Sequence, residues 1–273
     1  MRGITIEHSG ILFQKNLSVP TPQAGEALIR IQAAALNRRD HWISIGKYPA
    51  IQKHSILGSD GCGVVEKVLN SSLEEEAHPL LGKEVVLCPS LNWGQNQSYQ
   101  SKQFSILGMP QNGCFAEYTA LPIRYLEEKP KHLTAKQAAA LPLAGLTAWR
   151  ALFTKALLQP KEKILITGVG GGVSLIALQL ALAVGAEAYV SSSSDQKIEQ
   201  AVQMGAKDGF NYNNPAWYKG AAKHLNVVLD SAGGPDFDKL VRLLGMGGRL
   251  VFIGGTKGKW SPILPQHLFF NPW

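Results

Sequence analysis

Cysteine is scarce in this chain. Only Cys62, Cys88 and Cys114 occur among its 273 residues, and none of them forms a C-x-x-C pair. An odd number of widely spaced cysteines argues against a disulfide framework of the kind that staples small secreted domains. The scarcity therefore excludes that class of protein and predicts a reducing, cytoplasmic compartment.

Blocks of like charge and membrane-length apolar runs are missing as well. The formal net charge is +7, but Lys and Arg are scattered singly and are not interleaved with aromatic residues, so a nucleic-acid partner is not expected. Residues 1–10 hold no apolar signal core and are typical of a first strand. The most apolar window, 173–190, is interrupted by Ser174 and Glu187, which favours a buried helix followed by a strand over a membrane partner.

Two domains are expected from the length and from a change of character near residue 123. Residues 1–122 contain short strand-like runs separated by Pro and Gly, which indicates a compact β-rich domain. Residues 123–273 alternate between strand-type and helix-type runs, which indicates an α/β domain with a doubly wound, mostly parallel sheet. The expected elements are strand 163–167, helix 172–184, strand 187–191, helix 195–204, strand 208–211, helix 215–223, strand 226–230, helix 235–244 and strand 248–253. Five of the six strands of a complete dinucleotide-binding sheet are therefore present.

The structure of three connecting segments can also be predicted from the sequence. They are a polar, acidic loop at 70–79, an irregular surface lobe with few apolar anchors at 91–113, and a helical region at 134–158 that is interrupted at Pro142 and Gly145. Thr134 and Gln137 have the spacing of a capping box, which marks the start of the helical region.

A glycine-rich turn joins a buried-strand run to an apolar helix-type run within 163–186. Such a turn lets the backbone approach phosphates closely, and the helix that follows offers free N–H groups and the positive end of its dipole. The spacing is G-x-x-G-x-x-S, so Ser174 stands where Gly or Ala is usual. An ordinary strand-to-helix turn is the alternative, because a glycine turn alone is weak evidence. The residues predicted to bind a dinucleotide pyrophosphate are Gly168, Gly171, Gly172 and Val173.

Seven segments, in a fixed order, match the motifs of one family. Three lie in the first half: 33–49, with A-x-N-x-x-D and G-x-Y-P, then 57–68, LGSDGCGVVEKV, and 113–122, GCFAEYTALP. Four lie in the second half: 138–152, the glycine turn, 227–234 and 248–255. On these motifs the whole chain resembles the zinc-free, quinone-oxidoreductase-like branch of the medium-chain dehydrogenase/reductase family, which is alcohol dehydrogenase-like.

The resemblance implies a GroES-like β-barrel domain over 1–122 and a Rossmann dinucleotide-binding domain over 123–273, with catalysis in the cleft between them. Family members continue further, complete a sixth strand that is often a dimer edge, and return to the first domain. We therefore expect a chain that is truncated just past its fifth strand, with an apolar end at 267–273. An unpaired edge would lower stability, and it would weaken the homo-oligomer that the family implies.

The resemblance also argues against a metal site. Zinc-dependent members carry Cys, His and Cys or Asp ligands at three of these motifs, where this chain has Asn37, Ser59 and Leu143. None of the three offers a thiolate or an imidazole. The lobe that holds a structural zinc ion with four cysteines in the family has Cys88 alone in this chain. No metal is therefore expected at either place.

The second strand of the dinucleotide-binding sheet is expected to end in four serines at 191–194. NAD enzymes place an Asp or Glu there to bind the ribose 2′-hydroxyl, and without that carboxylate nothing repels a 2′-phosphate. Ser192 and Lys197 are predicted to bind this phosphate, which favours NADP(H) as the cofactor. Asp195 is a nearby carboxylate that could favour NAD instead, but it is interpreted as a helix N-cap. For Lys197, the alternative to phosphate binding is a solvated residue on the helix surface.

By motif position, the resemblance places Asn37 and Tyr48 near the nicotinamide as catalytic candidates. Asn37 would donate its amide to the substrate oxygen, and Tyr48 would donate a hydrogen bond or a proton. The alternatives are that Asn37 is a polar group satisfied within the fold and that Tyr48 is an aromatic part of the cleft wall. Asp40 is interpreted as a structural residue that holds the turn. The remaining cofactor-binding candidates are Thr147, by resemblance, and Ser231 and Gly254, which follow the fourth and fifth strands of the sheet.

The expected absence of zinc limits the chemistry. A carbonyl is then not strongly polarised by a Lewis acid, whereas quinones and α,β-unsaturated carbonyls are already activated toward hydride. The predicted function is hydride transfer from NADPH to a small-molecule quinone or enone without metal. Zinc-independent alcohol dehydrogenase-like activity is one alternative, and a non-catalytic cofactor-binding protein is the other, because the chain looks truncated.

Overall fold

The computed structural model describes residues 1–7, 10–70, 74 and 77–263 of the chain. The expected apolar end at 267–273 lies outside the described residues, as does part of the expected acidic loop at 70–79. Among the described residues, no helix is both long enough and apolar enough to span a bilayer.

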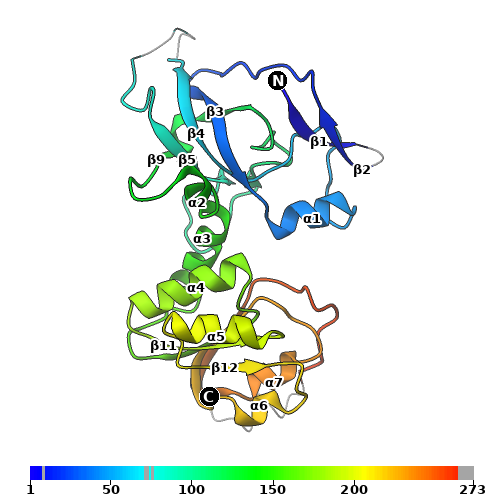
Figure 1. Cartoon of the computed structure of the whole chain (residues 1–273), viewed down its shortest axis with the longest axis vertical. Coiled ribbons are helices and arrows are strands. Elements are labelled where there is room, and N and C mark those ends of the chain that lie inside the picture. The colour runs from blue at the N-terminus through cyan, green and yellow to red at the C-terminus, as the bar shows by residue number, and fades with distance from the viewer. Residues whose placement is uncertain (8–9, 71–73, 75–76, 264–273) are drawn as a thin grey trace. The chain divides into compact units, whose positions relative to one another are not determined.

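The chain divides into two compact units, Met1–Leu143 and Ala144–Trp273 (Figure 1). The division falls after the expected boundary at 122/123, for a structural reason. The strand β9 (Leu126–Glu128) pairs with β5 (Glu84–Leu87), and the helix α2 (Ala135–Ala139) packs on the same sheet. Residues 123–143 are therefore held by the first unit.

A five-stranded antiparallel sheet forms the centre of the first unit, in the order β8-β3-β4-β5-β9. Its other strands are β3 (Glu26–Ala35), β4 (Asp60–Val68) and β8 (Tyr118–Pro122). Ala27 and Ile29 of β3 are buried, because alternate side chains of a strand point to the same face. The helix α1 (Arg38–Ser44) begins after β3, and Asn37 lies at this junction.

Two shorter strand pairs complete the first unit. β1 (Gly3–Glu7) pairs with β2 (Gly10–Gln14), and β6 (Ser90–Leu91) pairs with β7 (Ser105–Ile106). The segment 91–113 is otherwise irregular and has few apolar anchors, as expected. Leu107 and Met109 are buried, with 0% and 4% of their surface exposed, so the segment is fixed to the core.

The second unit contains the parallel sheet that the sequence predicts, in the order β12-β11-β10-β13-β14. Its strands are β10 (Lys163–Ile166), β11 (Glu187–Ser192), β12 (Asp208–Asn211), β13 (Leu225–Asp230) and β14 (Leu244–Phe252). The helix α4 (Gly172–Ala183) follows β10, and α5 (Asp195–Gln203) packs on β11 and β12 (Figure 1). The five-stranded α/β prediction is confirmed.

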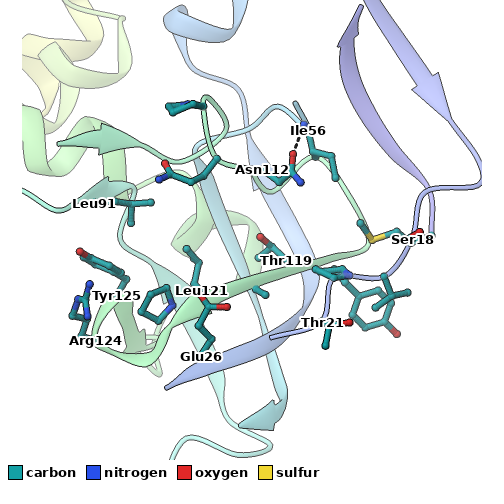
Figure 2. Close-up of a pocket in the computed structure, with 18 of the residues that line it drawn as sticks. Ser18, Thr21, Glu26, Ile56, Leu91, Asn112, Thr119, Leu121, Arg124 and Tyr125 are labelled. Carbon is teal, nitrogen blue, oxygen red and sulfur yellow. Dashed lines mark hydrogen bonds between the residues drawn. The ribbon is translucent and has the colours of Figure 1, made fainter. Parts of the chain in front are cut away.

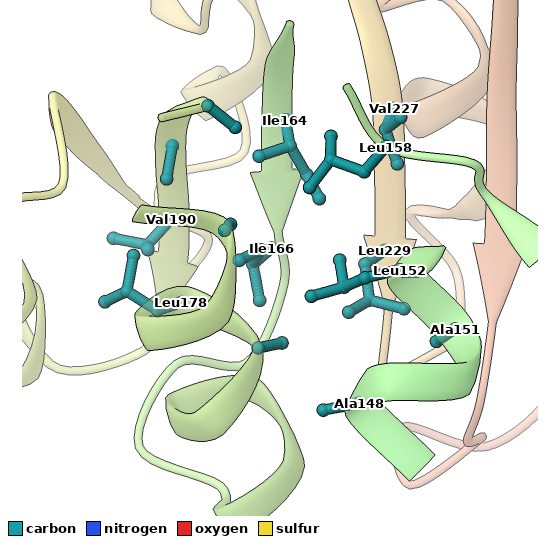
Figure 3. Packing of buried hydrophobic residues seen from close by; sticks show 14 of the residues in the cluster. Ala148, Ala151, Leu152, Leu158, Ile164, Ile166, Leu178, Val190, Val227 and Leu229 are labelled. Carbon is teal, nitrogen blue, oxygen red and sulfur yellow. The ribbon is translucent and has the colours of Figure 1, made fainter. Parts of the chain in front are cut away.

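The core of the second unit explains why β10 lies at the centre of the sheet. Ile164 and Ile166 of β10 are fully buried between neighbouring strands and helices (Figure 3). Leu178 from α4 packs on one side of the cluster and Leu152 on another, as Figure 3 shows. Strands that are covered on both faces read as continuous apolar runs, which is how this strand was predicted.

Helix bounds differ from the expectations in three places. α3 (Pro142–Trp149) starts at the predicted Pro142, but it runs through Gly145 into a π-helical segment, Arg150–Lys155, because one glycine lowers helix propensity without ending a helix. α6 (Trp217–Gly220) and α7 (Phe237–Val241) are shorter than predicted. Thr134 caps α2 with Gln137 in the predicted capping box.

Candidate active site

The glycine turn after β10 has the backbone that phosphate binding requires. Gly168 and Gly170 adopt φ angles of +66° and +105°, in the left-handed region that favours glycine. Gly171 is the N-cap of the twelve-residue helix α4, and no side chain caps this end. Gly170, Gly171 and Gly172 are exposed, while Val173 is half-buried. Backbone N–H groups at this helix start are therefore open to an anion.

Two glycines of this turn are packed closely against other residues of the second unit. A Cβ atom on Gly168 would lie 2.6 Å from Ser231 Oγ, and one on Gly170 would lie 2.6 Å from Lys197 Cδ. Gly254, which follows β14, has the same property, because its Cβ would lie 2.6 Å from the Ser231 carbonyl oxygen. Glycine at these three positions therefore allows the close packing around the turn, and the uncapped start of α4 is the feature that fits a dinucleotide pyrophosphate.

Side-chain hydrogen bonds join the carboxyl ends of β10 and β13. Thr167 Oγ1 donates to Asp230 Oδ1 at 2.6 Å, and the Ser231 N–H donates to Thr167 Oγ1 at 3.0 Å. The Ser174 and Ser231 hydroxyls both donate to the Thr167 carbonyl at 2.8 Å. This explains the serine at the third position of the motif, because its buried hydroxyl fixes the strand end beside the turn.

The serine loop after β11 differs in detail from the expectation. Ser192 is buried, and its hydroxyl accepts a hydrogen bond from the Ser194 N–H at 3.3 Å. Ser193 is exposed, so the sequence reasoning missed the hydroxyl that faces solvent. Lys197 is exposed, and its aliphatic stem lies beside Gly170 of the turn. The loop therefore exposes one serine to solvent, and α5 places one lysine next to the glycine turn.

Asp195 is not the N-cap of α5, contrary to the expectation. Ser194 is the N-cap, and its side chain accepts from the Lys197 N–H. Asp195 is the first residue of the helix, and its carboxylate accepts from Asn211 Nδ2 at 2.8 Å. The carboxylate of Asp195, which could otherwise bind a ribose 2′-hydroxyl, is therefore hydrogen-bonded to Asn211 at the end of β12. Thr147 lies half-buried on α3 in the same unit.

In the first unit, one buried carboxylate holds Asn37. Asn37 Nδ2 donates to Asp60 Oδ2 at 2.9 Å, and the Leu143 N–H donates to Asp60 Oδ1 at 2.8 Å. Burial raises the pKa of Asp60 to about 6, against the lowering effect of these two hydrogen bonds. Asp40 accepts from the Asn37 N–H at 2.7 Å, which matches its expected role in holding the turn.

Sequence reasoning missed Arg39, which connects Tyr48 to the interior of the first unit. Only 8% of Arg39 is exposed. Its Nη1 donates to Ser59 Oγ and, at 2.9 Å, to the Leu107 carbonyl, and its Nη2 donates to the Met109 carbonyl at 3.3 Å. Its Nε lies 3.4 Å from the Tyr48 hydroxyl, and its Cζ lies 5.0 Å from the Tyr48 ring centroid.

One sequence signal could have identified Arg39 as buried. It lies four residues before the apolar Ile43, and this spacing puts both residues on the same, buried face of α1.

A pocket of about 250 Å³ opens beside Tyr48. It is lined by Arg39, Tyr48, Pro49, Ala50, Gln52, Phe104, Ser105, Ile106, Met109 and Pro110. A larger hollow of about 850 Å³ shares Pro110 with this pocket and extends over another part of the unit, with Arg124 and Tyr125 at one end and Ser18 at the other (Figure 2). None of the predicted site residues is among the described residues that line it, so we assign the chemistry to the smaller pocket.

The three positions that the resemblance relates to zinc ligands are used differently in this chain. Ser59 is fully buried, and its hydroxyl donates to the Leu107 carbonyl at 2.7 Å while it accepts from Arg39. Leu143 contributes a backbone N–H, and Asn37 contributes an amide, both to Asp60. Within the described residues, no group of three or more His, Cys, Asp or Glu side chains could hold a metal ion.

Comparison with known proteins extends these observations. Residues 23–131 match the family model described as alcohol dehydrogenase GroES-like domain, and residues 172–271 match the one described as zinc-binding dehydrogenase. Zinc-type alcohol dehydrogenase-like protein YogA from Leptosphaeria maculans is 36% identical over 260 residues, which cover 89% of this chain and 72% of the relative.

Solved structures agree. An NAD-dependent alcohol dehydrogenase matches with a TM-score of 0.88 and 32% identity, covering 99% of this chain and 82% of that one. The quinone oxidoreductase of Thermus thermophilus, solved alone and with NADPH, matches with a TM-score of 0.77 and 27% identity, covering 99% of this chain and 78% of that one. With similarity of this extent in both halves, the chain belongs to the medium-chain dehydrogenase/reductase family of oxidoreductases, as an alcohol dehydrogenase-like and quinone oxidoreductase-like member.

Proposed function

We propose that this chain transfers hydride from NADPH to a small quinone or α,β-unsaturated carbonyl without a metal ion. The observation that carries the proposal is the hydrogen bond between Arg39 and Ser59, where zinc-dependent members of the family hold a ligand. A hydroxyl that is bound to a guanidinium is a poor partner for a cation such as Zn²⁺. Acceptors that need no Lewis acid are therefore the best substrates for this site.

The preference for NADPH is supported by the loop after β11. When bound, the cofactor supplies the hydride. Lys197, whose side chain lies beside Gly170 of the glycine turn, would receive the 2′-phosphate, and Ser193 is exposed in the loop that precedes it. Asp195, the carboxylate that would favour a 2′-hydroxyl, is held by Asn211 instead. The backbone N–H groups that start α4 would receive the pyrophosphate.

The first unit supplies donors for the substrate oxygen. One Asn37 Nδ2 hydrogen is bound to Asp60, which leaves the second for the substrate. Tyr48 accepts from Arg39 Nε, which leaves its own O–H free to donate. Both donors stabilise the negative charge that develops on the oxygen of an enone or a quinone as hydride arrives at carbon.

A steady-state assay tests the proposal. Purified protein is treated with EDTA and mixed with 9,10-phenanthrenequinone and either NADPH or NADH. We expect turnover that survives EDTA and a KM that is lower for NADPH. Alcohol oxidation that needs added zinc would replace this function with a dehydrogenase one. Cofactor binding without any turnover would leave only a non-catalytic role.

A further inference from the structure

Arg39 is a buried cation whose partners are all neutral. Its four hydrogen bonds go to the Ser59 hydroxyl, the Tyr48 hydroxyl and two carbonyl groups. No carboxylate among the described residues forms an ion pair with it, although a buried charge normally has such a partner. Its positive potential is therefore left to act on whatever enters the neighbouring pocket.

The two nearest acids do not remove this potential. Asp40 and Asp60 interact with the charge of Arg39, but their oxygens bind Asn37 and Leu143 instead. Among the described contacts, neither carboxylate is hydrogen-bonded to the guanidinium.

The pocket beside Tyr48 suits an oxygen that gains negative charge. Arg39 is the one charged residue in its described lining, and Phe104, Ile106 and Met109 are apolar neighbours that lower the local dielectric. Ser105, in the same lining, has a buried hydroxyl oxygen without a hydrogen-bond partner among the described residues.

The direction of the hydrogen bonds connects the charge to the pocket. Arg39 Nε donates to the Tyr48 oxygen, so the hydrogen of that hydroxyl is the next donor in the chain. A phenol that accepts from a cation is a stronger donor in turn, because successive hydrogen bonds polarise one another. The guanidinium also lies against the Tyr48 ring, which fixes the orientation of the phenol.

We propose that Arg39 is a positioning residue that stabilises, through the Tyr48 hydroxyl, the oxyanion that forms on the substrate during reduction. The inference rests on the proposed function. In the proposed reaction, the substrate carbon would form a C–H bond with hydride supplied by bound NADPH, which would leave as NADP⁺, and the π electron pair of the substrate would move to its oxygen. The resulting enolate or hydroquinone anion then takes a proton from water. Arg39 thus supplies a fixed charge where zinc-dependent relatives have a metal ion.

The direct test is the binding of 4-nitrophenol, whose phenolate form is yellow and whose phenol form is colourless. In the full chain with NADP⁺ present, absorbance titration near the pKa of the free probe measures which form binds. We expect wild type to bind phenolate over phenol by more than about tenfold, and Tyr48→Phe and Arg39→Met to lose this preference. Arg39→Lys should retain part of the preference for phenolate, because lysine keeps the positive charge but lacks the planar guanidinium group with its several N–H donors.

A matched control exists on the same unit. Arg124 lies 4.8 Å from the Tyr125 ring centroid and is exposed, so Arg124→Met removes an arginine from a similar pair outside the pocket. It should leave phenolate binding unchanged. In the reductase assay we expect Arg39→Met to lower kcat by about tenfold to a hundredfold, with little change in KM or in the Kd for NADPH.

The outcomes separate the two claims. Equal phenolate preference in wild type and Tyr48→Phe would overturn the role of Arg39, even if reduction of quinones is found. Tyr48→Phe decides the question if Arg39→Met does not fold, because it keeps the ring and the guanidinium contact. Absence of turnover with every quinone and enone, together with an intact phenolate preference, would reject the proposed reaction but retain the anion site.

Discussion

Asn37 Nδ2 and Asp60 Oδ2 are joined by a hydrogen bond of 2.9 Å at the junction between β3 and α1. The other oxygen of the same carboxylate accepts from the Leu143 N–H. Asp60 therefore connects two positions that the resemblance relates to zinc ligands. By accepting from both, the Asp60 carboxylate joins the segment at Asn37 to the segment at Leu143. The second hydrogen of Asn37 Nδ2 remains for the substrate.

The first prediction concerns the stability that Asp60 contributes. Burial raises its pKa from 3.8 to about 6, so the folded chain holds this proton more tightly than the unfolded chain does. The stabilisation by protonated Asp60 is complete below its unfolded pKa and is lost as the pH rises through about 6. The free energy of unfolding of wild type, relative to Asp60→Asn, should fall by roughly 2–3 kcal/mol between pH 4 and pH 7.

Urea unfolding of both proteins at four pH values measures this difference. Titration of the other groups cancels in the comparison, because the variant differs at one position and is neutral there throughout. A difference that does not change with pH would show that the carboxyl titrates in the folded chain as it does in the unfolded one.

The second prediction separates the two roles of Asn37. Asn37→Ala removes the amide donor and the helix cap together, and we expect kcat to fall by about tenfold to a hundredfold with about 1 kcal/mol lost in stability. Asn37→Ser keeps a capping oxygen without the amide. It should regain the part of the stability that the cap supplies and keep the low kcat. Recovery of kcat by the serine variant would assign Asn37 a structural role alone.

How far the sequence predicts this protein depends on how local the determining interactions are. The residues 164–166 form a continuous apolar run before a glycine turn, so the central strand and its phosphate cradle were predictable from local pattern. Arg39 was not, because its burial depends on the carbonyls of Leu107 and Met109, which lie 68 and 70 residues away in the sequence.

Serines at the end of β11 illustrate a finer limit. Four consecutive serines identify a loop without a carboxylate, but they do not tell which hydroxyl faces solvent. The strand continues through Ser192, where the Tyr212 N–H donates to the Ser192 carbonyl at 3.1 Å, and this buries the side chain predicted to bind phosphate. Asp195 was likewise misplaced by one residue, since Ser194 supplied the cap.

The third prediction tests the glycine turn. Gly168→Ala forces a side chain into a φ of +66° and places Cβ 2.6 Å from Ser231 Oγ, so we expect about 1–3 kcal/mol of destabilisation and weaker cofactor binding. Gly145→Ala is the matched control. Gly145 lies within α3 with no atom near its Cβ position, so alanine should raise stability by about 0.5–1 kcal/mol. Thermal unfolding, with and without NADPH, measures both. Equal melting temperatures for the two variants would contradict the strained geometry.

The fourth prediction concerns the choice between the two nicotinamide cofactors. Lys197 acts as a point charge toward a 2′-phosphate, so Lys197→Ala should raise the Kd for NADPH by about tenfold and leave the Kd for NADH within about twofold. Lys207→Ala is the control, because Lys207 is exposed just before β12 begins, at the opposite end of the parallel sheet. Fluorescence titration of both cofactors measures the four constants. If Lys197→Ala weakens both cofactors equally, the lysine binds the pyrophosphate or the turn, and the selectivity must come from Ser193 and the backbone around it.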